Sequence, residues 1–126
     1  MINISPQVVN ALETYYWKKT DKRPLAPVRD MIEFIYSAWQ SKLDMKEECL
    51  YSGSVLLHSI IKHTGRDYTY DLKEANDIFL AGRTLALQLT GILDKSKDDS
   101  PDEIYKKFKK ELEEQLLKKY EEVRKK

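Results

Sequence analysis

The chain has 126 residues, of which 41% are hydrophobic and 34% are charged. This length suits one domain with a single hydrophobic core, and the composition excludes both a disordered chain and a membrane-embedded one. Lysine and arginine number 22 against 21 acidic residues, so a net charge of +1 supplies no overall field to attract nucleic acid or an anionic membrane.

Cysteine usage and the first residues bear on location. Cys49 is the only cysteine, which excludes an internal disulfide and a zinc site made of several thiolates. The opening residues lack the basic and apolar regions of a secretion signal, and no run of about 18 apolar residues is present. We therefore expect a cytoplasmic protein that does not span a membrane.

Glycine and proline are scarce, and they fall between periodic segments, which predicts an all-α fold. Ser5 and Pro6 form a helix cap followed by proline, and the spacing of the next apolar residues predicts a first helix over 5–19. Its apolar face consists of Val8, Val9, Leu12, Tyr15 and Tyr16.

Two further helices are predicted after the proline-containing break at 24–27. The apolar pattern that starts at Val28 predicts a helix to about Lys42. A third helix is expected from Asp44 to His63, with Gly53 as a point of close helix contact.

The strongest periodicity in the chain lies between residues 72 and 93. Small residues at 75, 82 and 86 would allow a neighbouring backbone to approach closely. Leu80 and Leu87 add apolar surface on the far side of this helix, so we expect it to be the central helix of the bundle.

A polar linker over 95–100 precedes a charged amphipathic helix over 101–126. The helix has a narrow apolar stripe and acid-first pairs such as Asp102 with Lys106. The expected fold is thus a compact bundle of about five helices in a single domain, with four helices in residues 1–94 and a long, highly charged C-terminal helix.

Three elements are candidate partner contacts, because tyrosine, tryptophan and arginine are enriched where proteins bind one another. They are a basic and aromatic patch near the N-terminus, an aromatic loop, and the apolar stripe of the last helix, which packs either on a partner or on its own bundle. The candidate residues are Tyr16, Trp17, Lys18, Lys19, Lys22 and Arg23 in the patch, Arg66, Tyr68 and Tyr70 in the loop, and Phe108 and Tyr120 in the helix.

Basic side chains from Lys18 to Arg29 beside aromatic ones are also typical of surfaces that bind phosphates and stack on bases. A nucleic-acid-binding accessory protein is therefore one alternative. The other reading of these residues is an anchored helix followed by a basic loop.

Acidic residues three positions apart suggest a second alternative, because two helices that each carry such a pair can present four carboxylates to Mg²⁺. The residues concerned are Asp44, Glu47, Glu48, Glu74 and Asp77. The stretch from Lys73 to Leu80 resembles the second motif of the all-α nucleoside-triphosphate pyrophosphohydrolases, and the resemblance implies a magnesium-dependent enzyme. The first motif departs from the family pattern, either with Asp44 where glutamate is usual or, if the motif begins at Glu48, with Tyr51 at its fourth position.

No phosphate-binding glycine loop or nucleophile motif is present, and His58 and His63 are poorly spaced for one metal ion. We therefore expect no cofactor and no resident metal. The leading hypothesis is a non-enzymatic protein-interaction module, an inhibitor, adaptor or assembly subunit, whose partner is another protein or a second copy of the chain.

Overall fold

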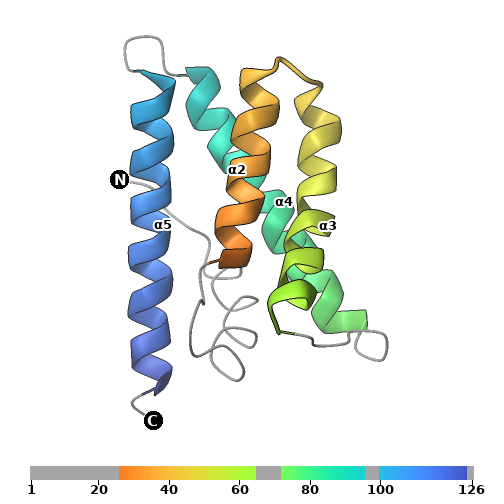
Figure 1. The fold of residues 1–126 in the computed structure, drawn as a ribbon, viewed down its shortest axis with the longest axis vertical. Coiled ribbons are helices and arrows are strands. Elements are labelled where there is room, and N and C mark those ends of the chain that lie inside the picture. The colour runs from red at the N-terminus through yellow and green to blue at the C-terminus, as the bar shows by residue number, and fades with distance from the viewer. Residues whose placement is uncertain (1–25, 65–71, 96–99, 125–126) are drawn as a thin grey trace.

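The computed structural model describes residues 26–64, 72–95 and 100–124, which form four helices. These helices are α2 (Ala26–Gln40), α3 (Met45–Thr64), α4 (Leu72–Lys95) and α5 (Pro101–Arg124). They run alternately up and down, with α5 beside α2 and α4 passing behind α2 and α3 (Figure 1). The all-helical prediction is confirmed for the described residues, while the predicted helix over 5–19 lies outside them.

The turn between α2 and α3 is a helix stop followed directly by a helix cap. Lys42 has a φ of 57°, and the Leu43 amide donates to the Ala38 carbonyl, which is the pattern of a left-handed C-terminal cap. Asp44 then accepts a hydrogen bond from the Lys46 amide at 3.1 Å, as the residue that caps a helix N-terminus does. The chain reverses in a few residues, and α2 and α3 therefore pack as antiparallel neighbours.

Two glycines set the distance between α3 and α4. A Cβ atom on Gly82 would lie 3.0 Å from the Cα of Gly53, so the two backbones nearly touch at this point. A Cβ on Gly53 would lie 2.8 Å from the ring of Phe79 and even nearer to the Phe79 carbonyl oxygen. The close contacts predicted at Gly53 and at position 82 are confirmed.

The hydroxyl of Ser52 strengthens the same crossing from inside the core. Its Oγ lies 2.5 Å from the Cys49 carbonyl oxygen and 3.2 Å from the Gly82 carbonyl oxygen of the facing helix. Because Ser52 is fully buried, these acceptors replace the water that its hydroxyl loses on folding.

The core is built from one side of each helix. Its largest fully buried side chains come from all four elements, and α4 packs against α2, α3 and α5. They are Met31, Ile32, Ile35, Leu56, Ile60, Ile78, Leu85, Leu89, Phe108 and Leu112. The helix expected over 72–93 therefore contacts the three other described helices, as a central helix does, but they cover only its inner side.

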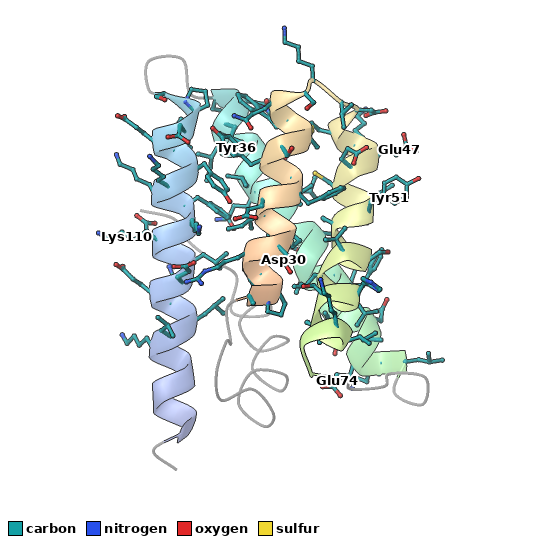
Figure 2. The ribbon with its side chains drawn as sticks, in the orientation of Figure 1. Asp30, Tyr36, Glu47, Tyr51, Glu74 and Lys110 are labelled. Carbon is teal, nitrogen blue, oxygen red and sulfur yellow. The ribbon has the colours of Figure 1, made fainter. Side chains whose placement is uncertain are left out.

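The last helix lies beside α2 from Tyr105 to Glu113 (Figure 1). Tyr105 of α5 stacks on Tyr36 of α2 with ring centroids 4.2 Å apart, and Arg29 forms an ion pair with Glu113 (Figure 2 labels Tyr36). The expected pair of Asp102 with Lys106 is also present, at 3.0 Å.

None of the described helices is both long enough and apolar enough to cross a lipid bilayer.

Candidate functional site

The acidic residues expected to bind Mg²⁺ together lie at opposite ends of the bundle. Glu47 is in the first turn of α3 and Glu74 is in the first turn of α4, which runs antiparallel to α3 (Figure 2). A 20-residue helix is about 30 Å long, so nearly the whole of α3 separates the two pairs. The expected convergence of Asp44, Glu47 and Glu48 with Glu74 and Asp77 is wrong, and no group of metal-binding side chains is found among the described residues.

The structure also shows what two of these acids do locally. The Asp44 carboxylate caps α3, and the Glu47 carboxylate accepts a hydrogen bond of 3.2 Å from the hydroxyl of Tyr51 one turn later. This hydrogen bond and the negative charge of Glu47 raise the pKa of Tyr51. Acids in the first turn of a helix also interact favourably with its dipole, which accounts for the pattern without a metal ion.

Two of the three predicted contact elements lie outside the described residues. They are the basic and aromatic patch and the aromatic loop, with Tyr16, Trp17, Lys18, Lys19, Lys22, Arg23, Arg66, Tyr68 and Tyr70. At the end of the basic segment, Arg29 lies in α2 and pairs with Glu113 across the α2–α5 contact.

The third element, the stripe of the last helix, is used by the chain itself. Phe108 has an exposed fraction of 0% and lies in the core with Leu112 and Leu116, so its assignment as a partner contact is wrong in this structure. The apolar stripe of the last helix could pack on a partner or on its own bundle, and over 104–116 the structure shows it packed on its own bundle. Tyr120 lies in α5 beyond the side chains that the structure describes.

Exposed apolar side chains instead gather on α3 and α4. In the described part of the chain, six of the eight large exposed apolar residues belong to these two helices, and the others are Leu43 and Leu117. We call the six the α3–α4 apolar set: Leu50, Tyr51, Ile61, Leu72, Leu80 and Leu87. None of them was among the predicted contact residues.

On α4, the exposed leucines lie opposite the buried side. Leu80 and Leu87 are 45% and 51% exposed, while Leu85, Ala86 and Leu89 are fully buried. The far-side position of Leu80 and Leu87 was visible in the sequence. We expected other helices to cover it, but α2, α3 and α5 all pack on the inner side.

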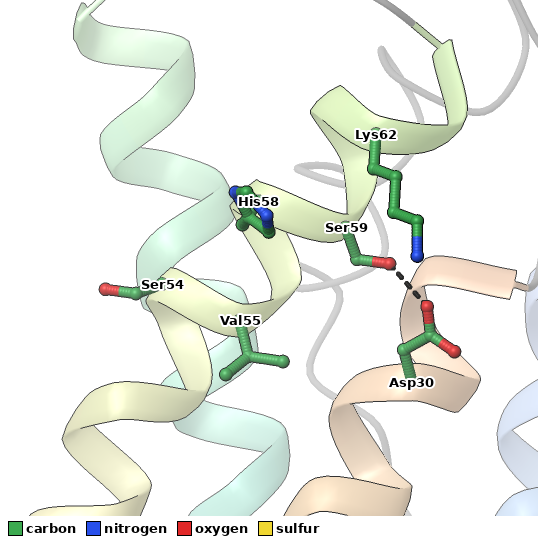
Figure 3. Close-up of a pocket in the computed structure, with 6 residues that line it drawn as sticks. All are labelled: Asp30, Ser54, Val55, His58, Ser59 and Lys62. Carbon is green, nitrogen blue, oxygen red and sulfur yellow. Dashed lines mark hydrogen bonds between the residues drawn. The ribbon is translucent and has the colours of Figure 1, made fainter.

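A hollow of about 380 Å³ lies between the beginning of α2 and the second half of α3 (Figure 3). Ser59 donates a hydrogen bond of 2.7 Å to the Asp30 carboxylate, and the Lys62 side chain extends toward this pair. Val55 forms an apolar part of the wall, and Ser54 and His58 complete the lining. The hydrogen bond joins two packed helices, which gives Asp30 and Ser59 a structural role.

A second hollow of about 440 Å³ lies at the end of the bundle where α2 meets α4. Its side chains include Trp39, whose indole Nε1 donates a hydrogen bond of 2.8 Å to Asp94 Oδ1. This bond ties the end of α2 to the end of α4, so two of the lining residues serve to connect helices.

The single thiol lies in the core between α3 and α4. Cys49 is 1% exposed, and its sulfur lies 3.7 Å from the Thr90 hydroxyl oxygen, which in turn donates to the Ala86 carbonyl. Burial raises the pKa of Cys49, against the smaller opposing effect of the Thr90 hydroxyl. A neutral buried thiol of this kind is a packing residue.

Comparison with known proteins adds no relative: no family model, curated protein or solved structure matches this chain. The exposed apolar side chains of α3 and α4 are therefore the feature of the described structure that bears most directly on function.

Proposed function

We propose that this chain is a non-enzymatic protein-interaction module, an inhibitor, adaptor or assembly subunit, that meets its partner through the α3–α4 apolar set. The supporting observation is that six exposed large apolar side chains lie on two adjacent helices, α3 and α4. The apolar stripe of α5, by contrast, is buried in the core. Large apolar side chains that a fold leaves exposed on neighbouring helices are typical of binding surfaces, because their removal from water drives association.

The chemistry of the described residues favours binding over catalysis. The acidic pairs are far apart, Cys49 is buried, and the polar groups of the two hollows include helix-to-helix hydrogen bonds. The exposed leucines and Tyr51, by contrast, contribute to no core. A cytoplasmic location, expected from the single cysteine, is part of the same proposal.

Quantitative capture from an extract of the native source tests this function. The chain is immobilised as wild type, as Leu50→Gln/Leu87→Gln, and as Leu117→Gln, a matched control that changes an exposed leucine on α5. Proteins that the wild type and the control both retain should be depleted by about tenfold or more with the double variant, because two buried leucines contribute about 1.5–3 kcal/mol each. Equal capture by all three proteins would contradict the proposal.

A further inference from the structure

The outward side of α4 has a composition that packing among the four described helices does not explain. Every position along it is exposed or half-buried, and the set contains two leucines and a glycine between opposite charges at the two ends. We call this set the α4 outer stripe: Lys73, Asn76, Leu80, Arg83, Thr84, Leu87, Gly91 and Asp94.

Gly91 is the first observation that points beyond the protomer. Glycine within a helix costs roughly 1 kcal/mol relative to alanine. Gly53 and Gly82 have a reason to be glycine, since a Cβ on either would meet the facing helix. A Cβ on Gly91 would meet no atom of the described residues within 4 Å, so the packing of the described helices does not require glycine there.

Charge and register supply the second observation. The outer stripe repeats at intervals of three and four residues, as in helices that pair along their length. If two copies of α4 pair antiparallel with Leu80 of one opposite Leu87 of the other, this leucine contact forms twice. The same register places Lys73 opposite Asp94 of the second copy, and Asn76 opposite Gly91 of the second copy.

Each of these pairs is chemically compatible. Lys73 and Asp94 are exposed residues of opposite charge. Asp94 accepts from Trp39 through Oδ1, so among the described residues its Oδ2 can accept from the lysine of the second copy. The missing side chain at Gly91 leaves space for Asn76 of the other helix. The stripe is thus complementary to itself, which is the condition for a twofold contact between identical chains.

We propose that two copies of this chain associate through the α4 outer stripe, with the two α4 helices antiparallel and Leu80 of each against Leu87 of the other. The inference rests on the proposed function and names a second copy as the partner. Arg83 lies on the same flank of the contact in both copies, close to the twofold axis, where the two like charges weaken the association. The dimer is consequently reversible and depends on protein concentration.

Sedimentation equilibrium of the purified full chain, from micromolar to millimolar concentration, measures this association. The wild type and the control Leu50→Gln should both rise from the protomer mass of 14.9 kDa toward twice that mass. Leu80→Gln/Leu87→Gln should stay at 14.9 kDa, with unchanged helical content because both side chains are exposed. Arg83→Gln should associate severalfold more tightly than the wild type, since it removes the like-charge contact.

The register is tested by cross-linking with a short thiol-specific reagent. An equimolar mixture of the Leu80→Cys and Leu87→Cys proteins should give more cross-linked dimer than either protein alone, and the buried Cys49 of the wild type should give none. Stronger cross-linking of each protein with itself would indicate parallel helices and overturn the register.

The two proposals fail separately. A wild type that remains at 14.9 kDa throughout the concentration range overturns self-association. If Leu50→Gln loses association as fully as Leu80→Gln/Leu87→Gln does, two copies associate through another surface, and the α4 outer stripe is overturned as the contact. If capture from the extract still depends on Leu50 and Leu87 in that case, the interaction function stands with a different partner.

Discussion

Gly53 and Gly82 face each other where α3 crosses α4, and a Cβ on Gly82 would lie only 3.0 Å from the Cα of Gly53. This contact brings Ser52 within hydrogen-bonding distance of the Gly82 carbonyl oxygen. It also turns the small side of α4 toward α3. Leu80 and Leu87 consequently remain on the outside.

Gly53→Ala should destabilise the protein by about 1–2 kcal/mol. The new methyl group would collide with the Phe79 carbonyl and ring, and this overpacking outweighs the gain in helix propensity of about 1 kcal/mol. Gly91→Ala is the matched control and should stabilise the protomer by about 0.5–1 kcal/mol, because its methyl group meets none of the described residues within 4 Å. Urea denaturation at low protein concentration measures the free energy of unfolding of both variants. Equal changes in the same direction would show that α3 and α4 do not pack this closely at Gly53.

Phe108→Ala should cost about 3–5 kcal/mol of stability, because the ring is fully buried between α5 and the rest of the bundle. Leu117→Ala, which shortens a 40% exposed leucine on the same helix, should change stability by less than about 0.5 kcal/mol. Thermal denaturation followed by circular dichroism measures both. A Phe108→Ala protein as stable as the wild type would mean that α5 is not held on the bundle in solution.

Tyr105 makes stability sensitive to alkaline pH. Burial is the main cause that raises the pKa of Tyr105 to about 12, and nearby acidic residues, with Glu33 the first of them, add to it. The unfolded chain loses this proton near its ordinary pKa of 10, so the contribution of Tyr105 is fully present below pH 10 and is lost as pH rises from 10 to about 12.

Tyr105→Phe should therefore remove part of the alkaline loss of stability. Its hydroxyl has no hydrogen-bond partner among the described residues, so the substitution should leave stability at pH 7 unchanged or raise it by up to about 1 kcal/mol. Denaturation curves at pH 7, 10 and 11 for both proteins test this, and the difference in tyrosinate absorbance reports the titration. An identical pH dependence in both proteins would contradict the burial of this hydroxyl.

The thiol of Cys49 should react with an aromatic disulfide reagent many-fold more slowly in the folded protein than in denaturant. Its sulfur is 1% exposed and its raised pKa keeps the thiolate population low. The time course of thiol modification at pH 8 measures this. Rapid stoichiometric reaction of the native protein would show that the contact between α3 and α4 opens readily.

Most of the fold within the described residues could be predicted from the sequence, because helix caps and apolar spacing are local signals. The third helix was expected from Asp44 to His63 and spans Met45–Thr64, and the fourth was expected over 72–93 and spans Leu72–Lys95. The close contact at Gly53 was expected for the same reason. A glycine inside an apolar helix pattern allows a neighbouring backbone to approach closely.

The candidate site was harder to predict, because exposure depends on which helices become neighbours. Leu80 and Leu87 fit a helix that is covered on all sides just as well as one with an open outer side, and Phe108 fits a partner contact as well as a core position. Asp44 belonged to an acid pattern typical of metal binding, yet the same residue type at the start of a helix caps it. Only the tertiary arrangement distinguishes these alternatives.

The most direct test of the α4 outer stripe as a contact surface is a dilution series of amide nuclear magnetic resonance spectra, from millimolar to micromolar protein. The outer stripe of α4 as a contact surface predicts concentration-dependent shifts that centre on Leu80, Thr84 and Leu87, with the amides of 104–112 unchanged. Shifts that centre on α5, or spectra that do not change with concentration, would contradict it.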